Sequence, residues 1–327
     1  MTFNSFRRMT ITVETSIPKI LNITHPIICA PMHAVTGGLL ASKVTEAGGL
    51  GLIGVGYSSR DWLEEELNKA KKDMFGVGFI SWRLAEHPDI LDLALERKPR
   101  AIWLSFGDIS PFVDKIKKAK VPLICQVQNV KQAKECKAQG ADIIVAQGAE
   151  AGGHGAARGA IALIPAVVDA VSPIPVLAAG GICDARGVAA AFVLGAQGVV
   201  MGTRFLASKE SLASEYVKAA VISSSGDNTI RTRIFDYARG LNWPNPYTAR
   251  TINNNFVSRM SSYHNAESVS DEEKYTVQSE YNQSLCEGKN EDLAIFAGEG
   301  IDMIHDVLPA SVILDKIMNE LNKILLY

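Results

Sequence analysis

A glycine-rich stretch, QGAEAGGHG at residues 147–155, carries the side chain best suited to acid–base chemistry. Five glycines fall within residues 147–159, which is typical of an open loop whose backbone lies close to a flat ligand. His154 is the one group of this loop that ordinarily titrates near neutrality, so we expect it to be catalytic. A surface histidine without a role is the alternative. The role of Glu150 is either helix capping or catalysis, and the sequence does not decide between them.

Two further glycine motifs have the composition of a phosphate site. AAGGI covers residues 178–182 and MGTRF covers residues 201–205. Their glycines let backbone N–H groups approach a phosphate, and the start of a helix expected near Asp184 would add favourable partial charge. Tight turns alone would explain one such motif, but two motifs on adjacent final strands favour a phosphate.

Other segments offer contacts for a heteroaromatic ring. Pro31 has no N–H and a fixed φ, so it shapes a rigid edge, and Met32 supplies a soft apolar contact. Gln126 and Gln147 project polar side chains from the ends of predicted strands. Either amide could hydrogen-bond a ring or cap a neighbouring loop.

The elements that must position these residues alternate between short apolar runs and longer segments of helical period. Runs without in/out alternation are typical of strands covered on both faces. Eight strand–helix units favour a (β/α)8 TIM barrel of the α/β class, whose ligands bind at the carboxyl ends of the strands, over an open doubly wound sheet. The predicted strands are residues 26–32, 50–56, 75–81, 101–107, 121–127, 141–148, 175–181 and 198–206.

The repeating pattern stops after residue 222. Residues 223–297 hold Asn-rich, Pro-rich and acidic pieces, which predict a partly helical, lid-like insertion over the barrel mouth. We therefore expect a barrel over 1–222, the inserted segment over 223–297, and a C-terminal helix over 298–327 that returns to the barrel. That last helix is predicted at residues 300–326. The role of the acidic part, 263–292, is not indicated.

Composition excludes several classes of protein. The 327 residues carry a formal net charge of −2 and no basic stripe, so nucleic acid is not an expected partner. Apolar runs are too short to span a bilayer, and five cysteines without a C-x-x-C pair favour a reducing, cytoplasmic location. The first 13 residues contain two arginines and no acid, and a short mitochondrial signal is the alternative. No cluster with the spacing of metal ligands is visible.

Together, these motifs resemble the nitronate monooxygenases, formerly called 2-nitropropane dioxygenases. The resemblance runs from about residue 17 to the C-terminus, and it is shared in large part with FMN-dependent enoyl-acyl-carrier-protein reductases and NAD(P)H:quinone reductases. It rests on APM at 30–32, EAGGLG at 46–51, AQGAEAGGHG, AAGGI, VVMGTRF, RIFDYARGLNWPNPY and AGEGIDMIHDVLP.

The resemblance implies an FMN site and a catalytic His154. Many bacterial members have a histidine at the position of Ser105, so the outer substrate contacts of this chain are open. The residues it assigns to the flavin are Ala30, Pro31, Met32, Ser81, Gln126, Gln147, Gly152, Gly180, Gly181, Gly202 and Thr203.

The implied reaction is the FMN-dependent oxidation of alkyl nitronates, such as propionate 3-nitronate, by O2 to a carbonyl compound and nitrite. The expected partners are an anionic nitronate and O2, without nucleic acid or membrane, in a monomer or a homo-oligomer. An NAD(P)H-dependent quinone or enoyl reductase is the alternative, and a catalytically idle flavin-binding protein is a third. The intact GGH loop counts against the third.

Overall fold

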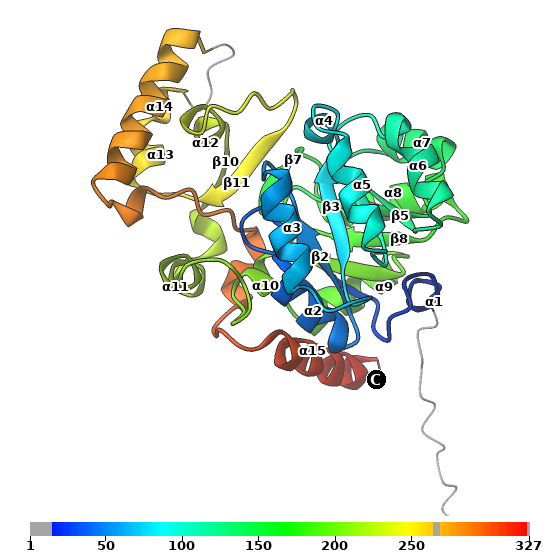
Figure 1. Ribbon diagram of the computed structural model, residues 1–327. Helices are drawn as coiled ribbons and strands as arrows, with labels where there is room; N and C mark the ends of the chain where they lie inside the picture. The colour runs from blue at the N-terminus through cyan, green and yellow to red at the C-terminus, as the bar shows by residue number, and fades with distance from the viewer. Residues whose placement is uncertain (1–14, 264–268, 326–327) are drawn as a thin grey trace, which may run out of the picture.

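Eight parallel strands close into a barrel in the computed structural model, which describes residues 15–263 and 269–325 (Figure 1). Each of the eight predicted strands contains an observed strand, and closure rules out the open sheet. The last prediction, 198–206, is wrong at its end, where residues 203–206 form a short helix. The side chains of the eight strands are almost all buried, as runs without alternation predict. In barrel order the strands are β1 (Ile27–Cys29), β2 (Leu50–Gly54), β3 (Gly76–Ile80), β4 (Ile102–Ser105), β5 (Leu123–Val127), β6 (Ile143–Gln147), β8 (Val176–Ala179) and β9 (Gly198–Met201).

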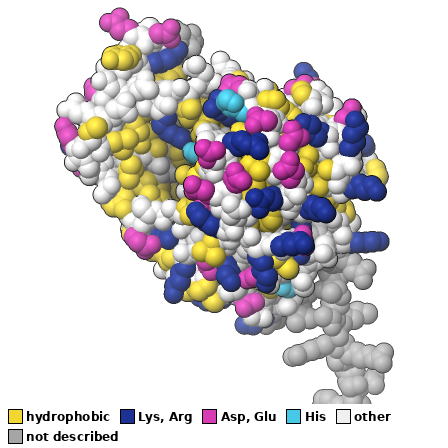
Figure 2. Space-filling model, in the orientation of Figure 1, with side chains coloured by type: hydrophobic (Ala, Val, Ile, Leu, Met, Phe, Trp, Pro, Cys, Tyr) yellow, Lys and Arg dark blue, Asp and Glu magenta, His cyan; other side chains and the backbone are white. Residues whose placement is uncertain are grey.

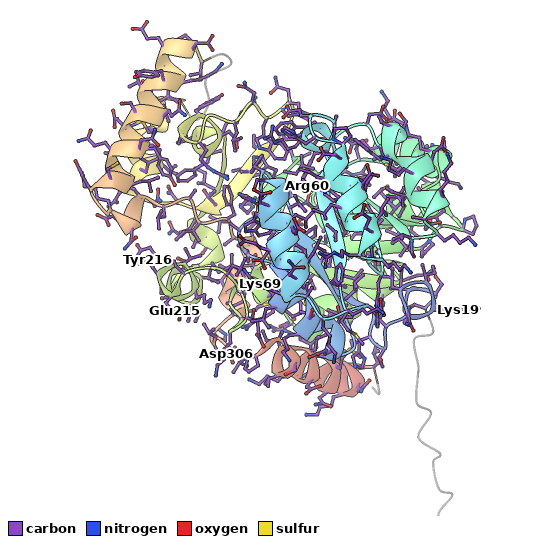
Figure 3. The ribbon with its side chains drawn as sticks, in the orientation of Figure 1. Lys19, Arg60, Lys69, Glu215, Tyr216 and Asp306 are labelled. Carbon is purple, nitrogen blue, oxygen red and sulfur yellow. The ribbon has the colours of Figure 1, made fainter. Side chains whose placement is uncertain are left out.

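A ring of amphipathic helices surrounds the barrel. Arg60 and Lys69 are about half exposed on α3, whose Leu63 and Leu67 are buried (Figure 3). The ring contains α2 (Gly38–Glu46), α3 (Arg60–Lys69), α5 (Asp89–Glu96), α6 (Ser110–Lys118), α7 (Val130–Gln139), α8 (Ala160–Val171), α9 (Ala185–Val193) and α15 (Ala310–Ile324), and the short α4 (Ser81–Leu84) follows β3.

Local signals set several helix ends. Asn129 accepts a hydrogen bond from the Gln132 backbone N–H at the start of α7, and Gly140 ends that helix at φ +100°. At the start of α9, Asp184 accepts from the backbone N–H groups of Arg186 and Gly187. The start of a helix near Asp184 was expected from the sequence, because such a cap depends on neighbouring residues alone.

A short helix, α1 (Ile17–Leu21), closes the amino end of the barrel. Ile17 and Leu21 are buried in the same cluster as the inward-facing Ile28, Trp103 and Leu177. Figure 1 shows α1 at the opposite end from α14. The packed bottom leaves the carboxyl ends of the strands as the place for a ligand.

Between β9 and α15 the chain makes a long excursion away from the barrel. Its elements are α10 (Thr203–Leu206), α11 (Glu215–Ser223), β10 (Thr229–Thr232), α12 (Ile234–Ala238), β11 (Thr248–Ile252), α13 (Asn255–Arg259) and α14 (Asp271–Cys286), with 3-10 turns at Gly226–Asn228, Ser261–Tyr263, Asn290–Asp292 and Glu299–Met303. Phe235, Phe256 and Tyr281 pack together in a core of their own. The predicted boundaries at 222 and 297 stay predictions.

An antiparallel sheet of three strands joins the excursion to the barrel. The order is β10–β11–β7, and β7 (Gly153–Gly155) lies inside the glycine loop predicted as open. Ala249 of β11 is the register partner of His154. The loop is therefore fixed by backbone pairing, which the sequence pattern did not indicate.

The single helix predicted over residues 300–326 is wrong in its first third. A 3-10 turn, Glu299–Met303, is followed by irregular chain, and α15 begins only after Pro309. Proline has no N–H to donate and cannot continue a preceding helix, which explains the break. The helix α15 does return to the barrel, where it packs against α2 and α9; residue 326 lies outside the described residues. No helix in the described part of the chain combines the length and hydropathy needed to cross a membrane.

Candidate active site

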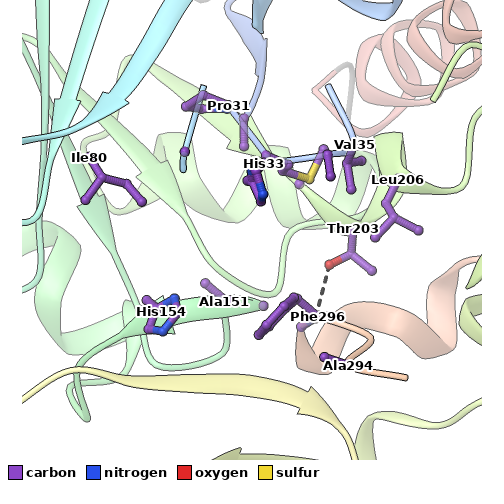
Figure 4. A pocket seen from close by; sticks show the side chains of 18 of the residues that line it. Pro31, His33, Val35, Ile80, Ala151, His154, Thr203, Leu206, Ala294 and Phe296 are labelled. Carbon is purple, nitrogen blue, oxygen red and sulfur yellow. Dashed lines mark hydrogen bonds between the residues drawn. The ribbon is translucent and has the colours of Figure 1, made fainter. Parts of the chain in front are cut away.

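A cavity of about 670 Å³ opens at the carboxyl ends of the barrel strands. This volume is in the range of cofactor and drug-sized ligands. Apolar side chains gather at the hollow between the excursion and the barrel (Figure 2). Figure 4 shows Pro31 on one side of the cavity, with His154 and Phe296 across the gap and Thr203 toward one end.

The end of the cavity near Thr203 is built from backbone. Gly180 and Gly181 have φ values of +108° and +69°, which favour glycine. Among the described residues, no protein atom accepts a hydrogen bond from the backbone N–H groups of Gly181, Gly202 or Thr203. Gly181 and Gly202 are partly exposed and all three residues line the cavity, so three backbone donors without a protein acceptor at one cavity end suit an oxyanion such as a phosphate.

A glycine segment near the C-terminus completes this end of the cavity. The Gly298 N–H donates to Thr203 Oγ1 at 3.0 Å, the bond drawn in Figure 4. A side chain at residue 300 would approach the Gly181 carbonyl oxygen to 2.6 Å, so the close approach requires Gly300. Sequence reasoning missed both glycines as site residues. The sequence also predicted that the first N–H groups of α9 would bind the phosphate. Asp184 already accepts hydrogen bonds from these groups, so they are not available to a ligand.

The segment after β1 forms one wall. Ala30, Pro31 and Met32 line the cavity, and the Ala30 N–H donates to the Met201 carbonyl at 3.0 Å. A Cβ at residue 78 would collide with the Pro31 ring at 2.3 Å, and one at residue 54 with the Met32 backbone at 2.4 Å. Glycines in β2 and β3 thus let this wall pack directly on the barrel.

Amides gather at the ends of β5 and β6. Gln147 Oε1 accepts hydrogen bonds from Gln126 Nε2 at 2.7 Å and Gln128 Nε2 at 2.9 Å. Gln126, Gln147 and Ser105 line the cavity. Ser81 does not: it is buried at the start of α4, and its hydroxyl has no partner among the described residues. The structure therefore separates Ser81 from the other predicted flavin contacts.

The strand β7 carries His154 into the cavity, beside Gly152. The imidazole Nε2 lies 2.8 Å from Asp236 Oδ1, and Asp236 is fully buried on α12. Burial lowers the pKa of His154 below its ordinary 6.5, and the Asp236 hydrogen bond and charge oppose this in part. A neutral imidazole that donates Nε2–H to the carboxylate leaves Nδ1 as a base.

Aromatic rings exclude water from this dyad. The indole of Trp243 stacks on His154 with ring centroids 3.5 Å apart and an interplanar angle of 9°. Its Nε1–H donates to the Tyr57 hydroxyl at 2.6 Å, which joins the excursion to the loop after β2. Phe106 packs edge-on against both Trp243 and His154. This desolvation is the main reason that the pKa of His154 is low.

Of the two roles considered for Glu150, helix capping and catalysis, the contacts favour the capping of α8. Both of its carboxylate oxygens accept from the Ala160 N–H, at 2.9 and 3.0 Å, at the start of α8. Asp236 and Trp243 were missed from the sequence as site residues. The motif RIFDYARGLNWPNPY contains both, but no local pattern links it to a histidine about 80 residues earlier in the chain.

Comparison with known proteins agrees with this geometry. The family model "Nitronate monooxygenase" matches residues 14–74 and 84–320. A probable nitronate monooxygenase of Staphylococcus aureus (strain Newman) is 32% identical, over 96% of this chain and 99% of that protein.

Two solved structures are similar at the level of fold and sequence. FabK from Thermotoga maritima has a TM-score of 0.80 and 30% identity, covering 96% of this chain and 97% of that one. The nitroalkane oxidase of Streptomyces ansochromogenes also has a TM-score of 0.80, with 25% identity over 94% of this chain and 98% of that one.

Proposed function

The chain belongs to the nitronate monooxygenase family of flavin-dependent oxidoreductases, and we propose that it oxidises alkyl nitronates by O2 to a carbonyl compound and nitrite. The observation that carries this proposal is the His154–Asp236 dyad, a desolvated base on the wall of a cavity of cofactor size. Propionate 3-nitronate is the substrate we propose to test first.

The cofactor we propose is FMN. The free backbone donors near Gly181 and Thr203 suit one phosphate, and Pro31 and the amide of Gln147 suit a heteroaromatic ring. No G-x-G-x-x-G fingerprint for a second nucleotide is present in the sequence, which disfavours FAD. When bound, FMN supplies the electron chemistry with O2. Denatured holoenzyme should release stoichiometric FMN, and release of FAD would contradict the assignment.

His154 gives the site two ways to handle its substrates. Toward a neutral nitroalkane, Nδ1 of the neutral imidazole accepts the α-proton, and Asp236 stabilises the imidazolium that forms. Toward a preformed nitronate, no proton has to be removed, and a protonated His154 stabilises the negative charge. The aromatic side chains around Trp243 keep water away from His154 in both reactions.

Steady-state kinetics with the purified holoenzyme test the proposal. We expect O2 consumption and nitrite release with propionate 3-nitronate, without any requirement for NAD(P)H. A protein that shows no turnover of nitronates but rapid oxidation of NADPH by a quinone would contradict it.

The second candidate is an FMN-dependent NAD(P)H:quinone or enoyl reductase. The specific observation in its favour is the likeness to FabK, which matches this chain as well as the nitroalkane oxidase does. With no second nucleotide fingerprint in the sequence, NAD(P)H would have to enter through the same mouth as the other substrate. Anaerobic bleaching of the flavin by NADPH, faster than any nitronate turnover, would favour this candidate.

A further inference from the structure

Among the residues that the structure describes, a single cationic side chain other than histidine lines the cavity. Of its lining residues, Arg239 is the one arginine, and lysine, aspartate and glutamate are absent from the lining. Arg239 follows α12, three residues after Asp236, and it is partly exposed. The one carboxylate beside this lining, Asp236, lies behind His154 and is paired with it, so the exposed charge of the lining is biased toward anions.

The arginines that lie near Arg239 in the excursion are all engaged by protein atoms. Arg231 donates to the Thr248 carbonyl at 2.8 Å, Arg233 to the Trp243 carbonyl at 2.5 Å, and Arg250 pairs with Glu299 at 2.7 Å. Arg239 instead makes neither an ion pair nor a side-chain hydrogen bond with any residue in the described ranges. Its donors remain free for a ligand.

Two aromatic rings hold the guanidinium in place. The Arg239 Cζ lies 5.3 Å from the Tyr57 ring centroid and 5.5 Å from that of Phe296. These rings come from segments far apart in the sequence, the loop after β2 and the segment before the C-terminal glycines. Cation–π contacts restrain the side chain while they leave its in-plane N–H groups unsatisfied.

The guanidinium is also close to the reacting end of the site. The Phe296 ring centroid is 5.5 Å from the Arg239 Cζ and 6.2 Å from the imidazole centroid of His154. The distance from the guanidinium to the imidazole therefore cannot exceed the sum of these two distances. The charge of Arg239 also contributes to lowering the pKa of His154. This upper limit is compatible with a short substrate that carries an anionic group at each end.

We propose that Arg239 is the specificity-determining residue that binds a carboxylate at the far end of the nitronate substrate. The proposal rests on the function proposed above and narrows its substrate class to short nitronates with a second anionic group. The planar fork of arginine fits a carboxylate through two parallel hydrogen bonds. A nitronate without that group would forgo this contact and keep only its contacts with His154 and the apolar wall.

The test compares two nitronates that differ in the distal group, propionate 3-nitronate and propyl-1-nitronate, in wild type and in Arg239→Met. We expect kcat/KM for the carboxylated substrate to fall by about 10- to 100-fold, mostly through KM, because the lost contact holds the substrate without taking part in the chemistry. For propyl-1-nitronate we expect a loss of less than about threefold, because the charge pair is missing from the start. Arg239→Lys keeps the positive charge but not the planar guanidinium, so its kcat/KM for the carboxylated substrate should lie between those of wild type and Arg239→Met.

A matched control separates a local contact from a change in net charge. Lys131→Gln removes one positive charge from the outer face of α7, where the side chain is 87% exposed, and should leave the preference for the carboxylated substrate unaltered. Flavin content and circular dichroism confirm that each variant is folded.

A binding measurement decides the proposal even if nitronates are not the substrates. Propionate, which carries the carboxylate without a reacting group, should perturb the flavin absorbance on titration into wild type and bind at least about tenfold more weakly to Arg239→Met. An equal loss for both nitronates, or unchanged propionate affinity in the variant, would overturn the assignment of Arg239. Absence of all nitronate turnover, with propionate binding lost in the variant, would instead overturn the proposed reaction and keep the carboxylate site.

Discussion

Replacing Asp236 with asparagine should weaken His154 as a base without emptying the site. The carboxylate is fully buried and 2.8 Å from Nε2, and its other oxygen, Oδ2, has no partner among the described residues. Asparagine keeps the shape and an oxygen that accepts the Nε2–H. It removes the negative charge that stabilises the imidazolium formed when Nδ1 takes a proton.

The size of the effect follows from the strength of that contact. A hydrogen bond to a charged group contributes about 1.5–3 kcal/mol, so loss of the charged partner should slow proton abstraction by about 10- to 100-fold. The hydrogen bond and charge of Asp236 raise the pKa of His154, so their removal lowers it further. A base acts above its pKa. The acid limb of kcat/KM for a nitroalkane should therefore move to lower pH while the plateau falls.

The assay is the pH profile of kcat/KM for nitroethane and for ethyl nitronate, in wild type and Asp236→Asn. Activity on the nitronate, which has already lost its proton, should fall less than activity on the nitroalkane, and only through the smaller protonated fraction of His154. Asp292→Asn is the control, because Asp292 is equally buried in the excursion but is paired with Arg259 at 2.6 Å, away from the cavity lining. An unmoved acid limb in Asp236→Asn, with the nitroalkane plateau near that of wild type, would refute the dyad.

Three further substitutions test other parts of the site. His154→Ala should retain flavin but lose about 10²–10⁴ in rate on nitroalkanes, and less on preformed nitronates, as measured by the ratio of their kcat/KM values; an unchanged ratio at wild-type rates would remove His154 from the mechanism. Trp243→Ala should cost about 3–5 kcal/mol in a denaturant titration and, by hydrating His154, move the acid limb to higher pH, opposite to Asp236→Asn. Gly181→Asp should abolish flavin retention in a protein that still folds, because the new carboxylate would repel the phosphate. A Cβ at residue 181 would lie 3.2 Å from the Cβ of Glu150, which adds a second negative charge nearby. Undiminished flavin absorbance would place the phosphate elsewhere.

Local rules recovered the barrel and one end of its cavity. The eight strands are short apolar runs whose signal needs no partner, and the helix cap at Asp184 acts within three residues. The position of Gly181 and Gly202 followed from the rule that barrels bind ligands at the carboxyl ends of their strands.

The rest of the site depends on contacts between distant segments. The pairing of β7 with β11 and the bond from His154 to Asp236 join segments about 80 to 100 residues apart, and each half has an ordinary composition. Likewise Gly300 is required only because the Gly181 carbonyl lies against it. Such contacts leave no periodic trace, so the sequence predicted an open loop where the structure has a strand.

The placement of α15 has a consequence for biosynthesis. This helix fills the gap in the ring between α9 and α2, yet more than 100 residues of excursion separate it from β9. The ribosome therefore completes all eight strands well before the element that seals them emerges. Until then the face of α2 that packs against α15 stays uncovered in the nascent chain. Folding of this protein should finish late, because its final step joins the first and the last helix of the ring.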